Sequence, residues 1–282
     1  MTATPTEAIV VTGASTGIGA AAAAELARLG YVVFAGVRND ADASVVRALH
    51  ENVRALRLDV TVATEVAAAA DAVAASGLAV RGVVNNAGIA VAGPLEYLPV
   101  DELRRQFEVN LFGAVTVTQA FLPLLRPARG RLVFVGSISG RLATPFVAPY
   151  SASKFALRAV TDALRVELSP FGLSVSLIEP GSVKTPIWQK GHAGKDRLLG
   201  LLGPAAMEHY GRAIDALFAA TAREGRTAMP VERVTAAIVH ALTARKPKAN
   251  YLLGGPARAG SILALIPAGL RDRAIKKSMR LP

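Results

Sequence analysis

Residues 8–26 read AIVVTGASTGIGAAAAAEL, an apolar run, a turn with three glycines and an alanine-rich run of helix formers. This order predicts a buried strand, a tight turn and a helix. Glycine lets the backbone approach a bound anion closely, and the start of a helix presents unpaired N–H groups and a positive dipole end. The stretch therefore predicts a site for the pyrophosphate of a dinucleotide between the first strand and the first helix.

The same alternation of strand and helix continues along the chain. Apolar runs bounded by turn residues predict seven strands, at residues 8–12, 32–36, 53–58, 82–86, 131–135, 173–179 and 250–253. Helical periodicity fills intervals between them, at residues 17–29, 65–75, 101–125, 151–168 and 232–244. Strict alternation predicts one doubly wound α/β domain, with a seven-stranded parallel sheet covered by helices on both faces.

Two stretches depart from this alternation, and we expect both to be appendages of a single domain that spans residues 1–255. Residues 184–230 carry several glycines and many apolar side chains, and they predict a lid over a substrate site. Residues 256–282 form a basic extension, in which residues 262–270 and the basic residues after them predict an amphipathic helix. That helix either contacts a membrane surface, or covers the active site of a subunit, or packs on the edge of the sheet.

Composition excludes several classes of protein. With 282 residues, 52% hydrophobic and 19% charged, the chain is suited to a globular fold rather than to disorder. The absence of cysteine excludes a disulfide scaffold, a thiolate metal site and a cysteine nucleophile. The four histidines lack a metal-binding spacing, so we expect no metal site.

The charge and the N-terminal residues bear on partners and location. The net charge of +11 suits an anionic partner, but no nucleic-acid-binding motif occurs, so we expect no nucleic acid. The apolar run at residues 109–125 is short for a membrane span and holds polar residues, which favours a buried helix. No secretory signal pattern is visible near residue 1, so we expect a cytoplasmic protein.

Further motifs in the same order carry a family resemblance. TGASTGIG at residues 12–19 is followed by NNAG at residues 85–88, Ser137, YSASK at residues 150–154 and the pair Pro180-Gly181. Together these motifs resemble those of the classical short-chain dehydrogenase/reductase family, closest in look to its hydroxysteroid and retinol dehydrogenase branch. The resemblance implies a Rossmann-type fold and hydride transfer between a nicotinamide cofactor and a ketone or secondary alcohol. Two alternatives are a 3-oxoacyl-type reductase and a non-catalytic nucleotide-binding sensor on the same fold.

The resemblance also implies roles for four catalytic residues. Ser137 would donate a hydrogen bond to the substrate oxygen, and Tyr150 would pass the proton. Lys154 would bind the nicotinamide ribose and lower the pKa of Tyr150, while Asn110 would hold a water that connects Lys154 to solvent.

Elementary electrostatics is compatible with these roles. Tyr150 and Lys154 are four residues apart and so share one helix face. Lowering a tyrosine pKa from about 10 to about 7 requires about 4 kcal/mol. An ammonium about 4 Å away supplies about that amount at an effective dielectric constant of about 20. Residues 151–154 also read S-x-x-K, but the S-D-N and K-T-G motifs of penicillin-binding proteins are absent.

The end of the second predicted strand bears on the choice of cofactor. A site for NAD has a carboxylate there, whereas this chain has Arg38, whose guanidinium suits the 2′-phosphate of NADP(H). We therefore expect NADP(H) rather than NAD(H), although Asp40 and Asp42 lie nearby in sequence. The residues expected to bind the cofactor are Gly13, Ser15, Thr16, Gly17, Ile18, Gly19, Arg38, Asp59, Val60, Asn86, Ala87, Gly88, Tyr150, Lys154, Pro180, Gly181, Val183 and Thr185.

The apolar lid predicts a hydrophobic carbonyl substrate, such as a steroid, a retinoid or an aromatic ketone. Its large apolar residues are Trp188, Leu198, Leu199, Leu201, Leu202, Met207, Phe218 and Met229. The alternative is that these side chains pack on the core or on a neighbouring subunit. The resemblance further implies a homo-oligomer, a dimer or a tetramer, formed through the helices at residues 101–125 and 151–168.

Overall fold

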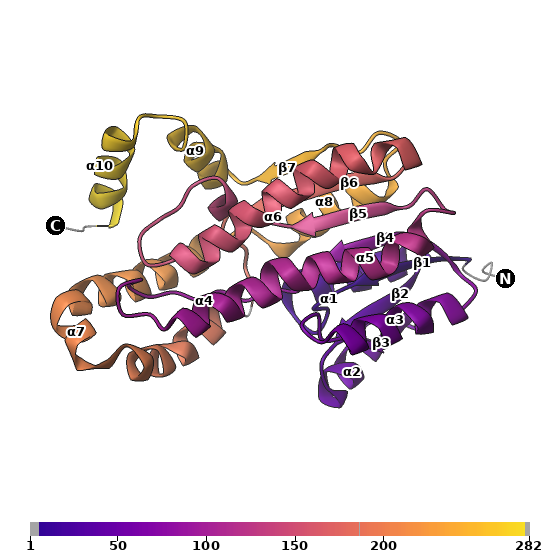
Figure 1. Ribbon diagram of the computed structural model, residues 1–282, viewed down its shortest axis with the longest axis horizontal. Coiled ribbons are helices and arrows are strands. Elements are labelled where there is room, and N and C mark those ends of the chain that lie inside the picture. The colour runs from indigo at the N-terminus through magenta and orange to yellow at the C-terminus, as the bar shows by residue number, and fades with distance from the viewer. Residues whose placement is uncertain (1–5, 186, 280–282) are drawn as a thin grey trace.

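The computed structural model describes residues 6–185 and 187–279 and shows one twisted sheet between two layers of helices (Figure 1). All seven strands are parallel, in the order β3-β2-β1-β4-β5-β6-β7. The strands are β1 (Glu7–Val11), β2 (Val32–Val37), β3 (Val53–Arg57), β4 (Ala79–Asn85), β5 (Arg131–Val135), β6 (Ser174–Pro180) and β7 (Asn250–Leu253). The predicted doubly wound α/β fold is confirmed.

The start of β4 differs from the prediction, which placed it at residue 82. Ala79 and Val80 already pair with β1, and the register then shifts so that Ile9 pairs with Gly82. The extra residue, Arg81, interrupts the apolar run and turns its guanidinium to the carbonyl of Ala128 at 2.6 Å. The bulge places a charged residue inside the strand, so the hydrophobic pattern did not predict the first residues of β4.

Helices cover both faces of the sheet. One layer contains α1 (Gly17–Arg28), α2 (Asp40–Arg47) and α8 (Val231–Thr243), and the other contains α3 (Ala63–Ala75), α5 (Gly113–Leu125) and α6 (Ala148–Glu167). Successive residues of β1 enter different cores: Ile9 packs with Leu26 of α1, and Val10 packs with Phe121 of α5. Because both faces are buried, central strands such as β1 and β2 read as mostly apolar runs.

The predicted helix at residues 101–125 is interrupted. It consists of α4 (Val100–Phe107), a π-helical turn η1 (Glu108–Phe112) and α5. Among the described residues, Val100–Leu125 is also the one helix whose length and composition would suit a membrane span. It behaves as a core helix instead, because Phe121 and Leu125 are fully buried against the sheet.

The strand order places a ligand site at the carboxyl edge of the sheet. Strands β1 to β3 are added in one direction across the sheet. The chain then returns to place β4 on the other side of β1, and β5 to β7 are added in the opposite direction. Such a reversal leaves a crevice between the two loops that follow the neighbouring strands. The glycine turn after β1 and the NNAG segment after β4 face each other there, and the loop after β5 and the start of α6 lie alongside.

The predicted lid is a long helix, α7 (Ile187–Thr227), broken at Gly203 and Pro204. Its two ends are tied together at the base, because Lys184 donates to the carbonyl of Met229 at 2.8 Å and Met229 donates to that of Ser182 at 2.9 Å. The chain segments that enter and leave α7 are therefore joined to each other beside the end of β6.

The C-terminal extension is also helical but not as predicted. Residues 262–270 do not form one helix: α9 (Gly255–Leu263) ends before Pro267, and α10 (Ala268–Met279) begins after it. A proline cannot continue the hydrogen-bond ladder of a helix interior, which accounts for the break. The first of these helices lies against η2 (Ile138–Gly140), and α10 contacts α7.

Candidate active site

The glycine turn has the geometry that an anion site needs. Gly13 has φ of 62°, and a Cβ at this position would lie 2.8 Å from the Cα of Ala87, so only glycine fits. Helix α1 begins with Thr16 as an N-cap whose side chain makes no capping hydrogen bond, and no acidic residue occurs in its first turn. The first amides of α1 are therefore free to bind a pyrophosphate.

Hydrogen bonds from the side chain of Asn86 stabilise this turn. Its Nδ2 donates to the carbonyls of Thr12 at 2.9 Å and Gly13 at 3.0 Å. In return, the backbone amides of Asn86 and Ala87 both donate to Oγ1 of Thr12 at 3.0 Å. Thr12 was not among the predicted site residues. Its signal in the sequence is a hydroxyl directly after a buried apolar strand.

Three predicted catalytic residues lie together at the carboxyl edge. Ser137 is buried after the end of β5, Tyr150 lies in the first turn of α6, and Lys154 follows one turn later. A Cβ on Gly140 would lie only 2.8 Å from the carbonyl oxygen of Lys154, so a residue without a side chain lets η2 approach α6 closely. This close approach keeps Ser137 beside Tyr150.

Burial affects the pKa values of both Tyr150 and Lys154. Burial raises the pKa of the Tyr150 phenol above its usual value, and a hydrogen bond with Ser137 acts weakly in the opposite direction. Burial also lowers the pKa of Lys154 from 10.5 to about 8. The lowering of the Tyr150 pKa by Lys154 stays a prediction. The Nζ of Lys154 donates to the carbonyl of Val135 at 2.8 Å and lies 5.8 Å from the Tyr150 ring centroid.

Asn110 lies in the π turn η1, and its side chain is fully engaged. Its Oδ1 accepts from the amide of Ile89 at 2.9 Å, while Nδ2 donates to the carbonyl of Ile89 at 3.0 Å and to Oγ of Ser153 at 3.1 Å. Ser153 in turn donates to the backbone carbonyl of Tyr150 at 2.7 Å. In this structure the side chain of Asn110 therefore positions the helix that carries Tyr150, and its role in holding a water stays a prediction.

A buried ion cluster lies directly behind the catalytic residues. Glu179, at the end of β6, has a side chain only 1% exposed. Its carboxylate accepts from Nε of Arg141 at 2.7 Å, from Nη2 of Arg141 at 2.5 Å and from Nη1 of Arg158 at 3.3 Å. Arg141 follows η2 and Arg158 lies on α6, so one carboxylate connects the elements that carry Ser137 and Tyr150.

Sequence reasoning missed this cluster because the residues are 17 to 38 positions apart. A signal was present in the sixth predicted strand, where a carboxylate follows the apolar pair Leu177 and Ile178. Buried acids are rare unless they are paired, so Glu179 implied a cationic partner without identifying it.

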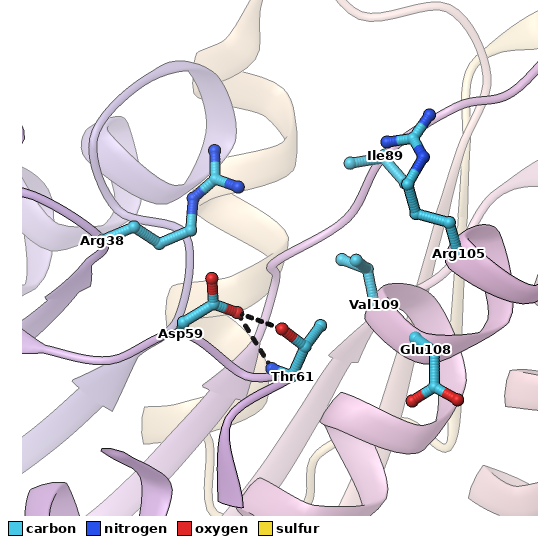
Figure 2. A pocket seen from close by; sticks show the side chains of 7 residues that line it. All are labelled: Arg38, Asp59, Thr61, Ile89, Arg105, Glu108 and Val109. Atoms are coloured by element: carbon cyan, nitrogen blue, oxygen red, sulfur yellow. Dashed lines mark hydrogen bonds between the residues drawn. The ribbon is translucent and has the colours of Figure 1, made fainter. Parts of the chain in front are cut away.

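A cavity of about 420 Å³ opens at the ends of β2 and β3. Its lining residues are Arg38, Asp59, Thr61, Ile89, Arg105, Glu108 and Val109. Figure 2 shows the Arg38 and Arg105 guanidinium groups on opposite sides of this space, with Asp59 beside Arg38. The cavity lies past the glycine turn, in the position that an adenosine half of a dinucleotide would occupy.

Two carboxylates near Arg38, those of Asp59 and Asp42, already accept hydrogen bonds. Asp59 accepts from the amide and the hydroxyl of Thr61 at 2.9 and 2.7 Å. Partial burial alone would raise the pKa of Asp59, but these hydrogen bonds and the charges of Arg38 and Arg57 hold the pKa below its usual value. Asp42 bonds to the side chain of Asn39, the N-cap of α2, at 3.1 Å.

The other predicted cofactor residues lie along the same edge. Gly88 faces Asn110, Gly181 donates to the carbonyl of Leu253 at 3.1 Å, and Val183 forms a bridge with Met229. The remaining members lie at or just after the ends of β1, β3 or β6; they are Ser15, Gly17, Ile18, Gly19, Val60, Pro180 and Thr185.

Phe146 was missed entirely, and it connects the catalytic helix to the lid. It has φ of 68°, a backbone conformation that bulky residues rarely adopt. Its carbonyl accepts from Gly93 at 2.6 Å, and its ring meets that of Tyr210 edge-on at 6.1 Å. Nothing in the local sequence predicts this conformation.

The apolar lid residues divide into two groups. Leu198 and Leu202 are buried in a cluster with Val91 and Leu98, which favours the packing alternative for these two. Leu199 and Met207 border the same cluster and are only partly buried. The side chain of Trp188 lies outside the described residues.

Among residues 6–185 and 187–279, no group of three or more histidine or acidic side chains could hold a metal ion. The donor set around Tyr150 instead consists of hydroxyls, amides and one amine. Such groups can hold an oxygen substituent and move a proton.

Comparisons with known proteins agree with this geometry. A family model described as short chain dehydrogenase matches residues 7–196. An NADPH-dependent 3-dehydrocapnine reductase from Ornithobacterium rhinotracheale is 36% identical over 96% of this chain and 96% of its own length. Retinol dehydrogenase 5 from Mus musculus is 34% identical over 89% of this chain and 81% of its own length.

Solved structures share the architecture. A short chain dehydrogenase from Burkholderia cenocepacia J2315, in complex with NADP, has a TM-score of 0.72 and 26% identity, with 100% of each chain covered. A short chain dehydrogenase/reductase from Burkholderia phymatum, in complex with NAD, has a TM-score of 0.75 and 24% identity, with 100% of this chain and 98% of that chain covered.

Proposed function

Because this chain belongs to the short chain dehydrogenase family, an NAD(P)-dependent oxidoreductase family that acts on CH–OH groups, we propose that it reduces a hydrophobic ketone with NADPH. Tyr150 is the group that supplies the proton. The observation that carries this proposal is the cluster of Ser137, Tyr150 and Lys154 at the carboxyl edge of the sheet, beside an anion-binding glycine turn.

The raised pKa of Tyr150 suits reduction. A phenol that stays protonated at neutral pH can donate its proton to a carbonyl oxygen, and Ser137 can donate a second hydrogen bond to the same oxygen. Lys154, with a pKa of about 8, holds a positive charge at pH 7 next to the phenolate that forms. When bound, the cofactor would supply the hydride for the carbonyl carbon.

The residues present fit such a cofactor. Free amides of α1 and Gly13 would hold the pyrophosphate, and Lys154 would hold the nicotinamide ribose. Arg38 is exposed at the rim of the adenosine cavity, which supports a preference for the 2′-phosphate of NADPH.

Apolar and aromatic side chains near Tyr150 support a hydrophobic substrate. Phe146, four residues before Tyr150, contacts Tyr210 of the lid, which borders the apolar cluster around Leu198 and Leu202. An apolar wall next to a polar proton donor favours a ketone attached to a hydrocarbon body.

The outer face of the helices α4 to α6 supports a homo-oligomer, a dimer or a tetramer. Phe112, Phe155 and Val166 are large apolar side chains exposed on this face. Covering such residues with the same face of a second copy would remove apolar surface from water. We expect this assembly in the cytoplasm.

An absorbance assay at 340 nm tests the proposed function. Purified protein is mixed with NADPH and a panel of steroid, retinoid and aromatic ketones, with sugar ketones as the matched polar control. We expect NADPH oxidation with at least one hydrophobic ketone and none with the sugars. Tight NADPH binding without turnover on any ketone would favour a nucleotide sensor instead.

A further inference from the structure

The C-terminal helices expose apolar side chains that the fold leaves uncovered. Ile262, Leu265 and Leu270 have relative exposures of 67%, 84% and 57%. The rest of the extension packs well: Ala257 of α9 and Ile275 of α10 are buried. The exposed side chains are therefore not a consequence of a detached tail, since the opposite faces of the same two helices are anchored on the protein.

The exposed faces follow helical spacing. Arg258, Ile262 and Leu265 are separated by four and three residues, so they lie on one side of α9 and its last turn. Leu270, Arg273 and Lys277 follow the same spacing on α10, with Lys276 next to them. Each helix thus presents apolar and basic residues together on its outward side.

The charge of this surface is one-sided. Arg258, Arg273, Lys276 and Lys277 are exposed, and Asp272 is the single acidic residue between Tyr251 and Pro282. Asp272 is itself bonded to Arg271 at 3.3 Å. A surface with exposed leucine and isoleucine side chains among unopposed cations is complementary to an anionic lipid surface, where acyl chains lie directly below the headgroups.

We propose that this surface, consisting of Arg258, Ile262, Leu265, Leu270, Arg273, Lys276 and Lys277, binds the protein to anionic membranes. Figure 1 shows α9 and α10 at one end of the molecule, with α9 directly after β7 and α10 farther from the sheet. Because α10 contacts α7, docking through this surface would bring the lid to the membrane. The inference goes beyond the proposed function and depends neither on the cofactor nor on the substrate.

Sedimentation with vesicles tests the proposal on the full chain. We expect the protein to co-sediment with an equimolar mixture of phosphatidylcholine and phosphatidylglycerol and to stay in solution with phosphatidylcholine alone. Each Lys or Arg near an anionic surface strengthens binding about fivefold, so Lys276→Gln with Lys277→Gln weakens binding about 25-fold. The matched control, Arg245→Gln with Lys246→Gln, removes the same charge from an exposed loop and should change binding less than about threefold.

The apolar contribution has its own test. Leu265→Ser should weaken vesicle binding about tenfold even in high salt, because burial of a leucine side chain is not screened. Val45→Ser, at an apolar residue 53% exposed on α2, is the control that should leave vesicle binding unchanged. Equal binding to both kinds of vesicle would overturn the proposal. The proposal would also be overturned if Leu265→Ser kept its affinity for vesicles but changed its oligomeric state on size-exclusion chromatography. The surface would then be a subunit interface.

Discussion

Replacing Lys154 with methionine should make the cofactor-free protein more stable at neutral pH. Lys154 is buried, and its pKa falls from 10.5 to about 8. A difference of one pKa unit is equivalent to 1.36 kcal/mol, so the charged amine costs the folded state about 3 kcal/mol at pH 7. The methionine variant also loses the hydrogen bond to the carbonyl of Val135, which lowers its free energy of unfolding by about 1 kcal/mol. We expect a net stabilisation of about 2 kcal/mol.

The sign of the pH dependence follows from the same numbers. Above pH 8 the folded protein releases the proton of Lys154, whereas the unfolded chain keeps it until about pH 10.5. The wild-type protein therefore gains stability from this group as the pH rises, and the methionine variant does not. The advantage of Lys154→Met should be largest at pH 7 and should nearly vanish by about pH 9.5.

Urea denaturation of both proteins at pH 7 and pH 9.5 measures this difference. Lys246→Met, at an exposed loop position, is the control and should show no pH-dependent change relative to wild type. An advantage for Lys154→Met that is equal at the two pH values would refute the reasoning, because desolvation of the amine would then not be its source. A variant less stable than wild type at pH 7 would refute it as well.

Three further variants test the site. Glu179→Gln should lower the free energy of unfolding by about 2 kcal/mol and reduce kcat, because it leaves Arg141 and Arg158 without the carboxylate that they share. The control is Glu25→Gln, which breaks an exposed ion pair within α1 and should change neither the free energy of unfolding nor kcat. Arg38→Ala should raise KM for NADPH at least tenfold more than KM for NADH, and equal effects would remove Arg38 from the phosphate site. Gly13→Ala should abolish NADPH binding in a fluorescence titration, because its Cβ would lie 2.8 Å from the Cα of Ala87; unchanged affinity would contradict the described turn.

The parts of the fold that the sequence predicted are those set by short-range pattern. Buried strands such as β1 and β2 read as apolar runs, and the turn at Gly13 has a composition that few other structures require. Helix α2 escaped prediction because its apolar face is small, with Ala43 and Val46 buried, although Asn39 is a typical N-cap.

The rest depends on contacts between distant residues. The π turn at Asn110 is stabilised by bonds to Ile89 and Ser153, neither of which is a neighbour in sequence. The pKa of Tyr150 depends on burial as well as on the charge of Lys154, and local sequence does not show how far the phenol is buried. Local spacing shows which groups share a helix face, but the free energy of desolvation depends on everything packed around them.

The most direct measurement is single-turnover oxidation of bound NADPH by Tyr150→Phe with a ketone that the wild-type protein reduces. Loss of the hydroxyl removes the proton donor but leaves the ring, so NADPH affinity should stay within about threefold while the rate falls by about a thousandfold. A variant that oxidises NADPH as fast as wild type would contradict the assignment of Tyr150 as the group that supplies the proton.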